Sequence, residues 1–280
     1  MTIHFFKKGS GPKLLLVHGL GGNSHSFDSI INELAMHREV IAVDLPGFGD
    51  SLPLPGEVTI STLSAALAAF LKEQNLIGID AVGSSMGARL VIEMKRQGNL
   101  LGDVVSLDPG GFWKGFKRHL FFGSIYLSIR LVRLLNPFLS KICNSKLGRT
   151  ILFAQFSARP WNLSAKEILT EMRSYIHAQS FDELLYNLTY GETQKGAPKN
   201  SITGRLTIGW GKHDRVCFSS QAKYALKLFP DATLHWFTHS GHFPHWDEPQ
   251  KTVQFILDNT QTKSFGKREH LDKQVQLHTT

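Results

Sequence analysis

Ser85 lies in the sequence context most typical of covalent chemistry. It is the middle residue of Gly83-Ser84-Ser85-Met86-Gly87, which follows a short apolar run and precedes an apolar segment with helical spacing. This pattern predicts a strand, a sharp turn and a helix, with the serine hydroxyl standing clear of the chain. Glycine at both ends allows strained backbone angles at the turn. Free N–H groups at a helix N-terminus favour negative charge, so the position suits acyl transfer.

A serine hydroxyl is a weak nucleophile and needs a base, which in turn needs a carboxylate to orient it. Asp214 and His242 each follow a late apolar run of the chain. Because the carboxyl ends of parallel strands meet at one edge of a sheet, both side chains are expected near Ser85. Asp108 also follows an apolar run and is the alternative acid.

A glycine-rich turn lies upstream of these residues. His18-Gly19-Leu20-Gly21-Gly22 directly follows the apolar run Leu14-Leu15-Leu16-Val17, which is typical of a buried parallel strand. Such a turn either reverses the chain or cradles an anion through backbone N–H groups. The chain lacks the Gly-x-x-x-x-Gly-Lys-Ser/Thr pattern of a nucleotide phosphate loop. A second glycine- and proline-rich turn covers residues 44–51.

Apolar runs alternate with helix-spaced segments through most of the chain, which predicts an α/β fold. We expect a mostly parallel, doubly wound sheet flanked by helices, built from residues 1–111 and 200–260. The alternation stops between them, so residues 112–199 are expected to form an inserted helical cap. Residues 261–280 are a polar tail to which the pattern assigns no function.

The apolar stretch at 119–135 falls within the expected cap. Arg130 and Arg133 interrupt it, and it is shorter than the roughly 20 residues that a membrane span needs. We expect a lipophilic cap helix. The alternative is an interfacial helix with its apolar side in lipid and its arginines at the headgroups.

Composition limits the class of protein and its partners. A chain of 280 residues with 42% hydrophobic content can bury one large core. Cys143 and Cys217 are far apart in sequence, and the N-terminus lacks a signal-peptide pattern, so a cytoplasmic location is expected. The net charge of +8 looks scattered along the chain, and no nucleic-acid-binding module is recognisable. The expectation is a solvated basic surface, with an anionic substrate, carrier or membrane surface as the alternative.

Histidines at 239, 242 and 245 could suggest a metal site. His239, His242 and His245 are three residues apart, but no His-Glu-x-x-His pattern accompanies them. Neither a metal ion nor another cofactor is therefore expected.

Five segments in chain order resemble the motifs of the α/β-hydrolase superfamily, and the resemblance covers about residues 12–258. These segments are residues 18–22, 44–51, 83–87, 211–215 and 240–242. It implies that Ser85 attacks, that His242 acts as general base and then acid, and that Asp214 orients His242. It also implies that the backbone N–H groups of Leu20 and Met86 form an oxyanion hole. Serine at position 85 is unlike the branches of the superfamily that use an aspartate nucleophile.

The leading expectation is a serine hydrolase that cleaves a carboxylic ester with an apolar acyl group. The stretch Gly241-His242-Phe243-Pro244-His245-Trp246 also resembles hydrolases that cleave carbon–carbon bonds of ring-cleavage products, for which Arg173 would be the candidate cationic group. A non-catalytic relative that binds a lipid or another ligand is the third possibility. Fluorophosphonate labelling of Ser85 separates the enzymes from this relative.

Overall fold

Seven strands form one sheet in the structure, a computed structural model that describes residues 2–98 and 100–260. The strand order is β1-β3-β2-β4-β5-β6-β7, and each neighbouring pair is parallel except β1 with β3. The expected mostly parallel α/β sheet is confirmed, and the expected polar tail lies outside the described residues. The strands are β1 (Phe5–Lys8), β2 (Lys13–Val17), β3 (Glu39–Val43), β4 (Ile79–Ser84), β5 (Leu101–Leu107), β6 (Leu206–Gly211) and β7 (Thr233–Phe237).

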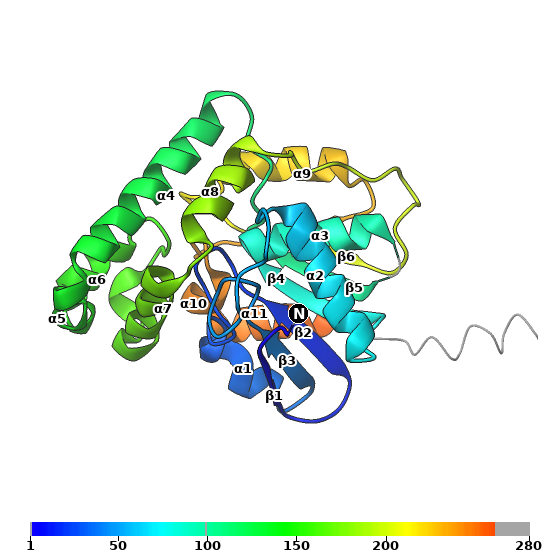
Figure 1. Cartoon of the computed structure of the whole chain (residues 1–280), viewed down its shortest axis with the longest axis horizontal. Helices are drawn as coiled ribbons and strands as arrows, with labels where there is room; N and C mark the ends of the chain where they lie inside the picture. Colours follow the sequence, from blue (N-terminus) through cyan, green and yellow to red (C-terminus); the bar gives the residue numbers. More distant parts are fainter. Residues whose placement is uncertain (1, 99, 261–280) are drawn as a thin grey trace, which may run out of the picture.

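Helices cover both faces of this sheet (Figure 1). On one face α2 packs on α3, which contacts β4 and β5; on the other face α1 packs on α11. The helices outside the insertion are α1 (Asp28–Leu34), α2 (Ile60–Glu73), α3 (Met86–Gln97), α9 (Ala222–Leu228), α10 (Pro244–Asp247) and α11 (Pro249–Asn259), with the short 3-10 helix η3 (Ser219–Gln221).

The apolar run of β2 supplies both layers of the core. Leu15 and Val17 pack in the cluster that includes the side chains of α2 and α3, whereas Leu14 and Leu16 pack with those of α1 and α11. All four side chains are at most 1% exposed. Because both faces of the strand are covered, an uninterrupted apolar run satisfies it better than an alternating one.

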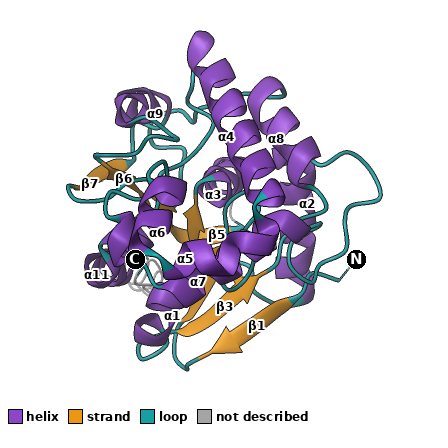
Figure 2. Cartoon of the chain, turned by 90° about the vertical axis from the view of Figure 1, so that its left-hand side faces the viewer, coloured by secondary structure: helices purple, strands orange, loops and turns teal. Residues whose placement is uncertain are grey.

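A helical insertion separates β5 from β6 (Figure 1). Figure 2 shows its helices in front of the sheet when the molecule is viewed from that side. The sequence predicts three of its helices, from the apolar stretch at 119–135, from a capping box that begins at Ser164 and from the apolar pattern of residues 181–188; α4, α7 and α8 lie there, and Ser164 is the N-cap of α7. The helices α5 and α6 were not predicted. The insertion comprises α4 (Phe116–Leu134), η1 (Asn136–Phe138), α5 (Leu139–Asn144), α6 (Lys146–Phe153), η2 (Pro160–Asn162), α7 (Ala165–His177) and α8 (Phe181–Tyr190).

α4 contains the apolar stretch that raised the question of a membrane segment. One of its faces is buried through Phe121, Ile125, Ile129 and Val132, which join the core cluster shared with α2 and α3. Among the residues that the structure describes, no helix combines the length and hydropathy needed to cross a bilayer.

A buried ion pair links β3 and β4 near the amino-terminal ends of these strands. The guanidinium Nη2 of Arg38, just before β3, donates to Oδ2 of Asp80 in β4 at 2.7 Å, and both side chains are at most 5% exposed. Oδ1 of Asp80 accepts the backbone N–H of Asp103 in β5 at 2.8 Å. Burial nevertheless raises the pKa of Asp80, so its charge depends on these partners.

Replacing Arg38 should therefore destabilise the fold strongly. Arg38→Ala should lower the free energy of unfolding by about 3–5 kcal/mol, because Asp80 would stay buried without its cation. As a control, Arg133→Ala removes a partly exposed ion pair with Asp182 and should cost less than about 1 kcal/mol. Urea unfolding of both variants measures the difference, and equal losses would contradict this assignment.

Candidate active site

The turn at Ser85 combines a strained backbone with two obligatory glycines. Ser85 is the N-cap of α3 and has φ of 56°, in the left-handed region. A Cβ at Gly83 would lie 2.3 Å from the carbonyl oxygen of Gly87. A Cβ at Gly87 would lie 2.3 Å from the carbonyl oxygens of Val17 and His18 in the neighbouring chain segment. Only glycine permits this approach, which holds the serine side chain at the carboxyl edge of the sheet.

Ser85, His242 and Asp214 form a continuous hydrogen-bonded chain. Nε2 of His242 lies 2.8 Å from Oγ of Ser85, and Nδ1 lies 2.9 Å from Oδ2 of Asp214. Because a carboxylate can only accept, Nδ1 carries the proton and Nε2 is free to accept the serine proton. The other carboxylate oxygen of Asp214 accepts the N–H groups of Val216 and Cys217 at 2.7 and 2.9 Å. The structure thus brings together three residues that are far apart in the sequence.

Leu20 and Met86 both lie near Ser85, Leu20 in the lining of the same cavity and Met86 as the next residue of the chain. Leu20 lines the same cavity as Ser85 and His242. The adjacent Gly19 approaches closely, since a Cβ there would lie 3.2 Å from Cβ of Ser85. The N–H of Met86 is the first of α3 and has no acceptor within the helix. That the backbone N–H groups of Leu20 and Met86 bind an oxyanion formed at Ser85 stays a prediction.

His18 holds this loop in place. Its Nδ1 donates to the carbonyl oxygen of Gly19 at 2.7 Å, and its Nε2 accepts the backbone N–H of Leu45 at 3.0 Å. Burial lowers the pKa of His18, which keeps the ring neutral and able to accept. The ring therefore joins the two glycine-rich turns and does not reach the reacting serine, in agreement with a structural role.

Asp108, the alternative acid, lies beside Asp214. It is fully buried with φ of 48°, and its Oδ1 accepts the N–H of Gly211 at 2.8 Å. Within the described residues its Oδ2 has no hydrogen-bond partner. Burial and the charge of Asp214 raise the pKa of Asp108 well above its usual value, which favours the protonated carboxyl. Among the described residues, Nδ1 of His242 is hydrogen-bonded to Asp214 and not to Asp108.

Asp247 supports the base and was not singled out by the sequence. Its Oδ2 accepts the N–H groups of Gly241 and Ala158 at 2.7 and 2.9 Å. The backbone N–H of His242 donates to the carbonyl oxygen of Phe156 at 2.8 Å. The loop that carries the base is thereby fixed to the helical insertion. A carboxylate five residues after the candidate base was the one local signal available.

Glu171 links the insertion to the glycine-rich loop. The hydroxyl of Ser26 lies 3.0 and 2.9 Å from the two carboxylate oxygens of Glu171 in α7. The hydroxyl of Ser174, one turn along α7, donates to the carbonyl oxygen of Gly21 at 2.9 Å. Burial raises the pKa of Glu171 to about 7. No sequence pattern linked residues 145 positions apart, so this contact was not predicted.

A largely apolar cavity of about 390 Å³ opens from Ser85 and His242. Its walls come mainly from α4, α6, α7 and α8, with Phe121, Ile129 and Met172 among the lining side chains. Among the residues that the structure describes, no Lys, Arg, Asp or Glu lines it. Arg173, the candidate cationic group, is exposed on α7 and lies outside the lining. The cavity therefore suits an uncharged, apolar group.

Candidate metal ligands are engaged in other contacts. Oδ2 of Asp214 is bonded to His242, and burial raises the pKa of the Cys217 thiol well above its usual value, which disfavours the thiolate that a metal binds. Burial lowers the pKa of His245 to about 3 and its ring packs on Phe27. In the described part of the chain, two groups have ligand atoms close enough to share an ion: Asp214, Cys217 and His242, and His4, Asp44 and Asp50.

Comparison with known protein sequences gives a family match and several relatives. The model of the alpha/beta hydrolase family matches residues 14–255. The pimeloyl-acyl-carrier-protein methyl ester esterase of Aeromonas hydrophila is 44% identical over 81 residues, which are 28% of this chain and 32% of the relative. The 2-hydroxy-6-oxononadienedioate/2-hydroxy-6-oxononatrienedioate hydrolase 2 of Pseudomonas putida is 23% identical over 92% of this chain and 91% of its own length.

Solved structures share the fold over nearly the whole chain. The esterase EaEST of Exiguobacterium antarcticum superposes with a TM-score of 0.73 and 16% identity. The match covers 93% of this chain and 96% of the esterase.

The two neighbouring carboxyls should respond differently to substitution. Asp214→Asn should lower kcat by about 10³- to 10⁴-fold, because the amide neither fixes the tautomer of His242 nor stabilises its protonated form. Asp108→Asn should leave kcat close to that of the wild type, because an amide resembles the protonated carboxyl in size and donor capacity. Steady-state hydrolysis of p-nitrophenyl acetate measures both. An equal loss in two folded variants would contradict the assignment of Asp214.

Glu171 should make stability depend on pH. Its pKa of about 7 in the folded chain lies above the ordinary 4.5, so the folded state holds a proton that the unfolded state releases. This contribution to the free energy of unfolding is complete below the pKa that Glu171 has in the unfolded chain, and it is lost as the pH rises through about 7. The free energy of unfolding of Glu171→Gln, relative to that of the wild type, should rise by up to about 3 kcal/mol between about pH 5 and about pH 8. Urea unfolding at both pH values checks this, and a pH-independent difference would rule it out.

Proposed function

The chain belongs to the alpha/beta hydrolase family, and we propose that it is a serine hydrolase that cleaves carboxylic esters with an apolar acyl group. The observation that carries the proposal is the hydrogen-bonded chain of Ser85, His242 and Asp214 at one end of a largely apolar cavity. Nucleophile, base and acid each have the partner that acyl transfer requires.

In the first half of the reaction, Oγ of Ser85 attacks the ester carbonyl carbon while Nε2 of His242 takes the hydroxyl proton. Asp214 stabilises the resulting imidazolium. The backbone N–H groups of Leu20 and Met86 bind the negative oxygen of the tetrahedral intermediate. Collapse of the intermediate breaks the bond to the alcohol oxygen, which leaves with the proton from His242 and gives an acyl-enzyme on Ser85.

In the second half, water repeats the attack. His242 takes a proton from the water as the oxygen adds to the acyl carbon. The same two N–H groups bind the second oxyanion. Collapse then releases the carboxylic acid and returns the proton to Oγ of Ser85, so that no cofactor enters the balance.

The cavity favours an aliphatic acyl group. Aliphatic side chains of α4, including Ile125 and Val132, form much of its wall, and no cationic or anionic side chain lines it. Burial of each additional CH₂ is favourable by about 0.8 kcal/mol, so a longer chain should bind better until the cavity is full. The segmental likeness to an esterase for acyl-carrier methyl esters supports an ester substrate of this kind.

Carbon–carbon hydrolysis is the competing function on the same residues, and the relative from Pseudomonas putida supports it. That relative is named for dicarboxylic substrates, which would call for cationic groups at both ends of the site. The lining contains no Lys or Arg, and Arg173 is exposed. These observations favour the ester over the ring-cleavage product.

A series of p-nitrophenyl esters tests the proposal. We expect kcat/KM to rise by more than about tenfold from the butyrate to the octanoate ester, because each buried CH₂ contributes about 0.8 kcal/mol. Ser85→Ala should lose about 10⁴-fold or more in kcat while remaining folded.

Two controls accompany this series. A fluorophosphonate probe should label the wild type and not Ser85→Ala, which separates a competent serine from an inert one. Retention of activity in Ser85→Ala would refute the proposal, and turnover of a vinylogous diketone acid in preference to every ester would assign the carbon–carbon reaction instead.

A further inference from the structure

The positive charge of the chain is concentrated in the first part of the insertion. Residues 109–166 contain ten Lys or Arg residues and no Asp or Glu. The rest of the chain has 21 basic residues against 23 acidic ones, so this stretch accounts for the whole net positive charge. The basic residues are therefore not scattered evenly along the chain, as was expected. Among the described residues, Arg133 is the one cation of the stretch with an ion-pair partner, Asp182.

α4 has a second apolar face that points to solvent. Phe116, Leu120, Leu127, Leu131 and Leu134 follow one another at intervals of four, seven, four and three residues, which places them along one side of the helix. Their side chains are between 47% and 75% exposed. The opposite side of α4 is the buried face described above, so the outward residues are not needed for the core.

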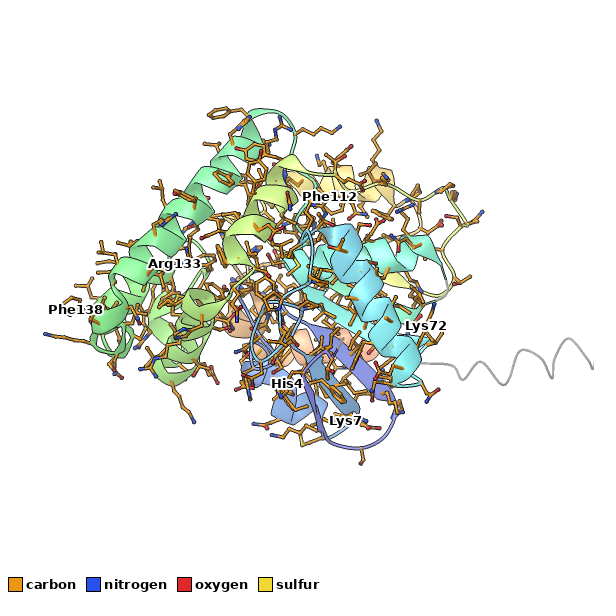
Figure 3. The ribbon with its side chains drawn as sticks, in the orientation of Figure 1. His4, Lys7, Lys72, Phe112, Arg133 and Phe138 are labelled. Atoms are coloured by element: carbon orange, nitrogen blue, oxygen red, sulfur yellow. The ribbon has the colours of Figure 1, made fainter. Side chains whose placement is uncertain are left out.

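The exposed apolar side chains continue beyond α4. Phe138 of η1 and Leu147 and Ile151 of α6 are 61–72% exposed. In Figure 3, Phe138 is labelled at the end of the insertion farthest from the sheet, whereas Lys72 lies on the opposite side of the molecule. We call the five outward residues of α4 together with these three the α4–α6 face. Lys141 and Lys146, both exposed, lie within the same stretch of chain.

The α4–α6 face is continuous with the cavity. Leu131 and Ile151 belong to both, since each lines the cavity and is also exposed to solvent. The cavity therefore reaches the surface between α4 and α6, among apolar side chains. An acyl chain that enters by this route would pass directly from the apolar side chains of the α4–α6 face into the apolar cavity.

We propose that the α4–α6 face docks on a bilayer containing anionic lipids and that the acyl chain of a lipid ester enters the cavity from the membrane. The inference rests on the proposed ester hydrolysis and names the source of its substrate. Apolar side chains gain free energy by leaving water for the acyl boundary, while exposed Lys and Arg bind anionic headgroups.

Charge distinguishes this partner from a second copy of the chain. Two α4–α6 faces packed together would bring the exposed Lys141 and Lys146 of both copies close to one another, and residues 109–166 contain no Asp or Glu to offset these charges, which is unfavourable. A small acidic protein would satisfy the cations, but eight exposed large apolar side chains spread over three helices favour an apolar phase over a charged protein surface. A bilayer with anionic headgroups accommodates both the cations and the exposed apolar side chains.

Vesicle co-sedimentation of the full-length Ser85→Ala chain tests the proposal, because this variant should not degrade the lipid. The chain should bind vesicles of phosphatidylcholine mixed with phosphatidylglycerol and bind phosphatidylcholine alone more weakly. High salt should release most of it, since ions screen the attraction to the headgroups. Failure to bind the mixed vesicles at low salt would overturn the proposal.

Two apolar substitutions locate the face. Leu127 and Leu134 lie outside the cavity lining. The double variant Leu127→Gln with Leu134→Gln should bind mixed vesicles at least about tenfold more weakly, because two exposed leucines no longer enter the lipid. Met36→Gln with Ile77→Gln is the matched control, since both residues are large, apolar and exposed outside the insertion. Equal binding by the two double variants would refute docking through the α4–α6 face.

Two lysine substitutions test the charge. Lys141→Ala with Lys146→Ala should weaken binding by about fivefold for each lysine removed. Lys7→Ala with Lys72→Ala removes the same charge from β1 and α2, away from the insertion (Figure 3), and should have little effect. Equal losses would show unspecific attraction and would overturn the proposal.

Further measurements separate the competing partners and the two proposals. Light scattering that shows a dimer dissociated by Leu127→Gln with Leu134→Gln would assign the face to a second copy. Displacement from vesicles by a stoichiometric amount of acidic acyl carrier protein would assign it to that protein. Hydrolysis of p-nitrophenyl butyrate by the leucine variant should equal that of the wild type. Intact hydrolysis without vesicle binding rejects docking alone, whereas vesicle binding without any hydrolysis rejects the enzymatic proposal.

Discussion

The close approach of Gly87 to the backbone at the end of β2 is the constraint on which the site depends. With only 2.3 Å available for a Cβ, the start of α3 lies directly against Val17 and His18. The start of α3 thus lies beside the glycine-rich loop, and Ser85, which precedes it, has φ in the left-handed region. The strain is maintained by the buried strands on either side, which leave the turn no room to relax.

The sequence predicted those parts of the molecule that local patterns define. Four-residue apolar runs located the buried strands, because a parallel strand covered on both faces needs no polar residue. Motif order placed Ser85, Asp214 and His242 at the same sheet edge. The helices α5 and α6 were missed because they are only six and eight residues long, too short for a clear helical period. The contacts of Glu171 with Ser26 and of Asp247 with Gly241 are tertiary and gave no periodic signal.

The insertion does more than cover the sheet edge. It supplies most of the cavity wall, it anchors the loop of the base through Phe156, and it anchors the glycine-rich loop through Ser174. The hydrophobic pattern of α4 is also divided between two sides, one in the core and one toward solvent. A shift of α4 or α7 would thus be transmitted both to the cavity and to the groups around Ser85.

The connection between β5 and β6 has a consequence for folding. These strands pair in parallel, with Val104 opposite Leu206, so the chain must close a loop of about one hundred residues before the sheet is complete. The entropy of closure grows only with the logarithm of loop length, by about 0.6 kcal/mol for each doubling. Closing a long connection between β5 and β6 therefore costs little more free energy than closing a short one. The segment between these two strands is free to diverge in length and sequence during evolution while the strand pairing persists.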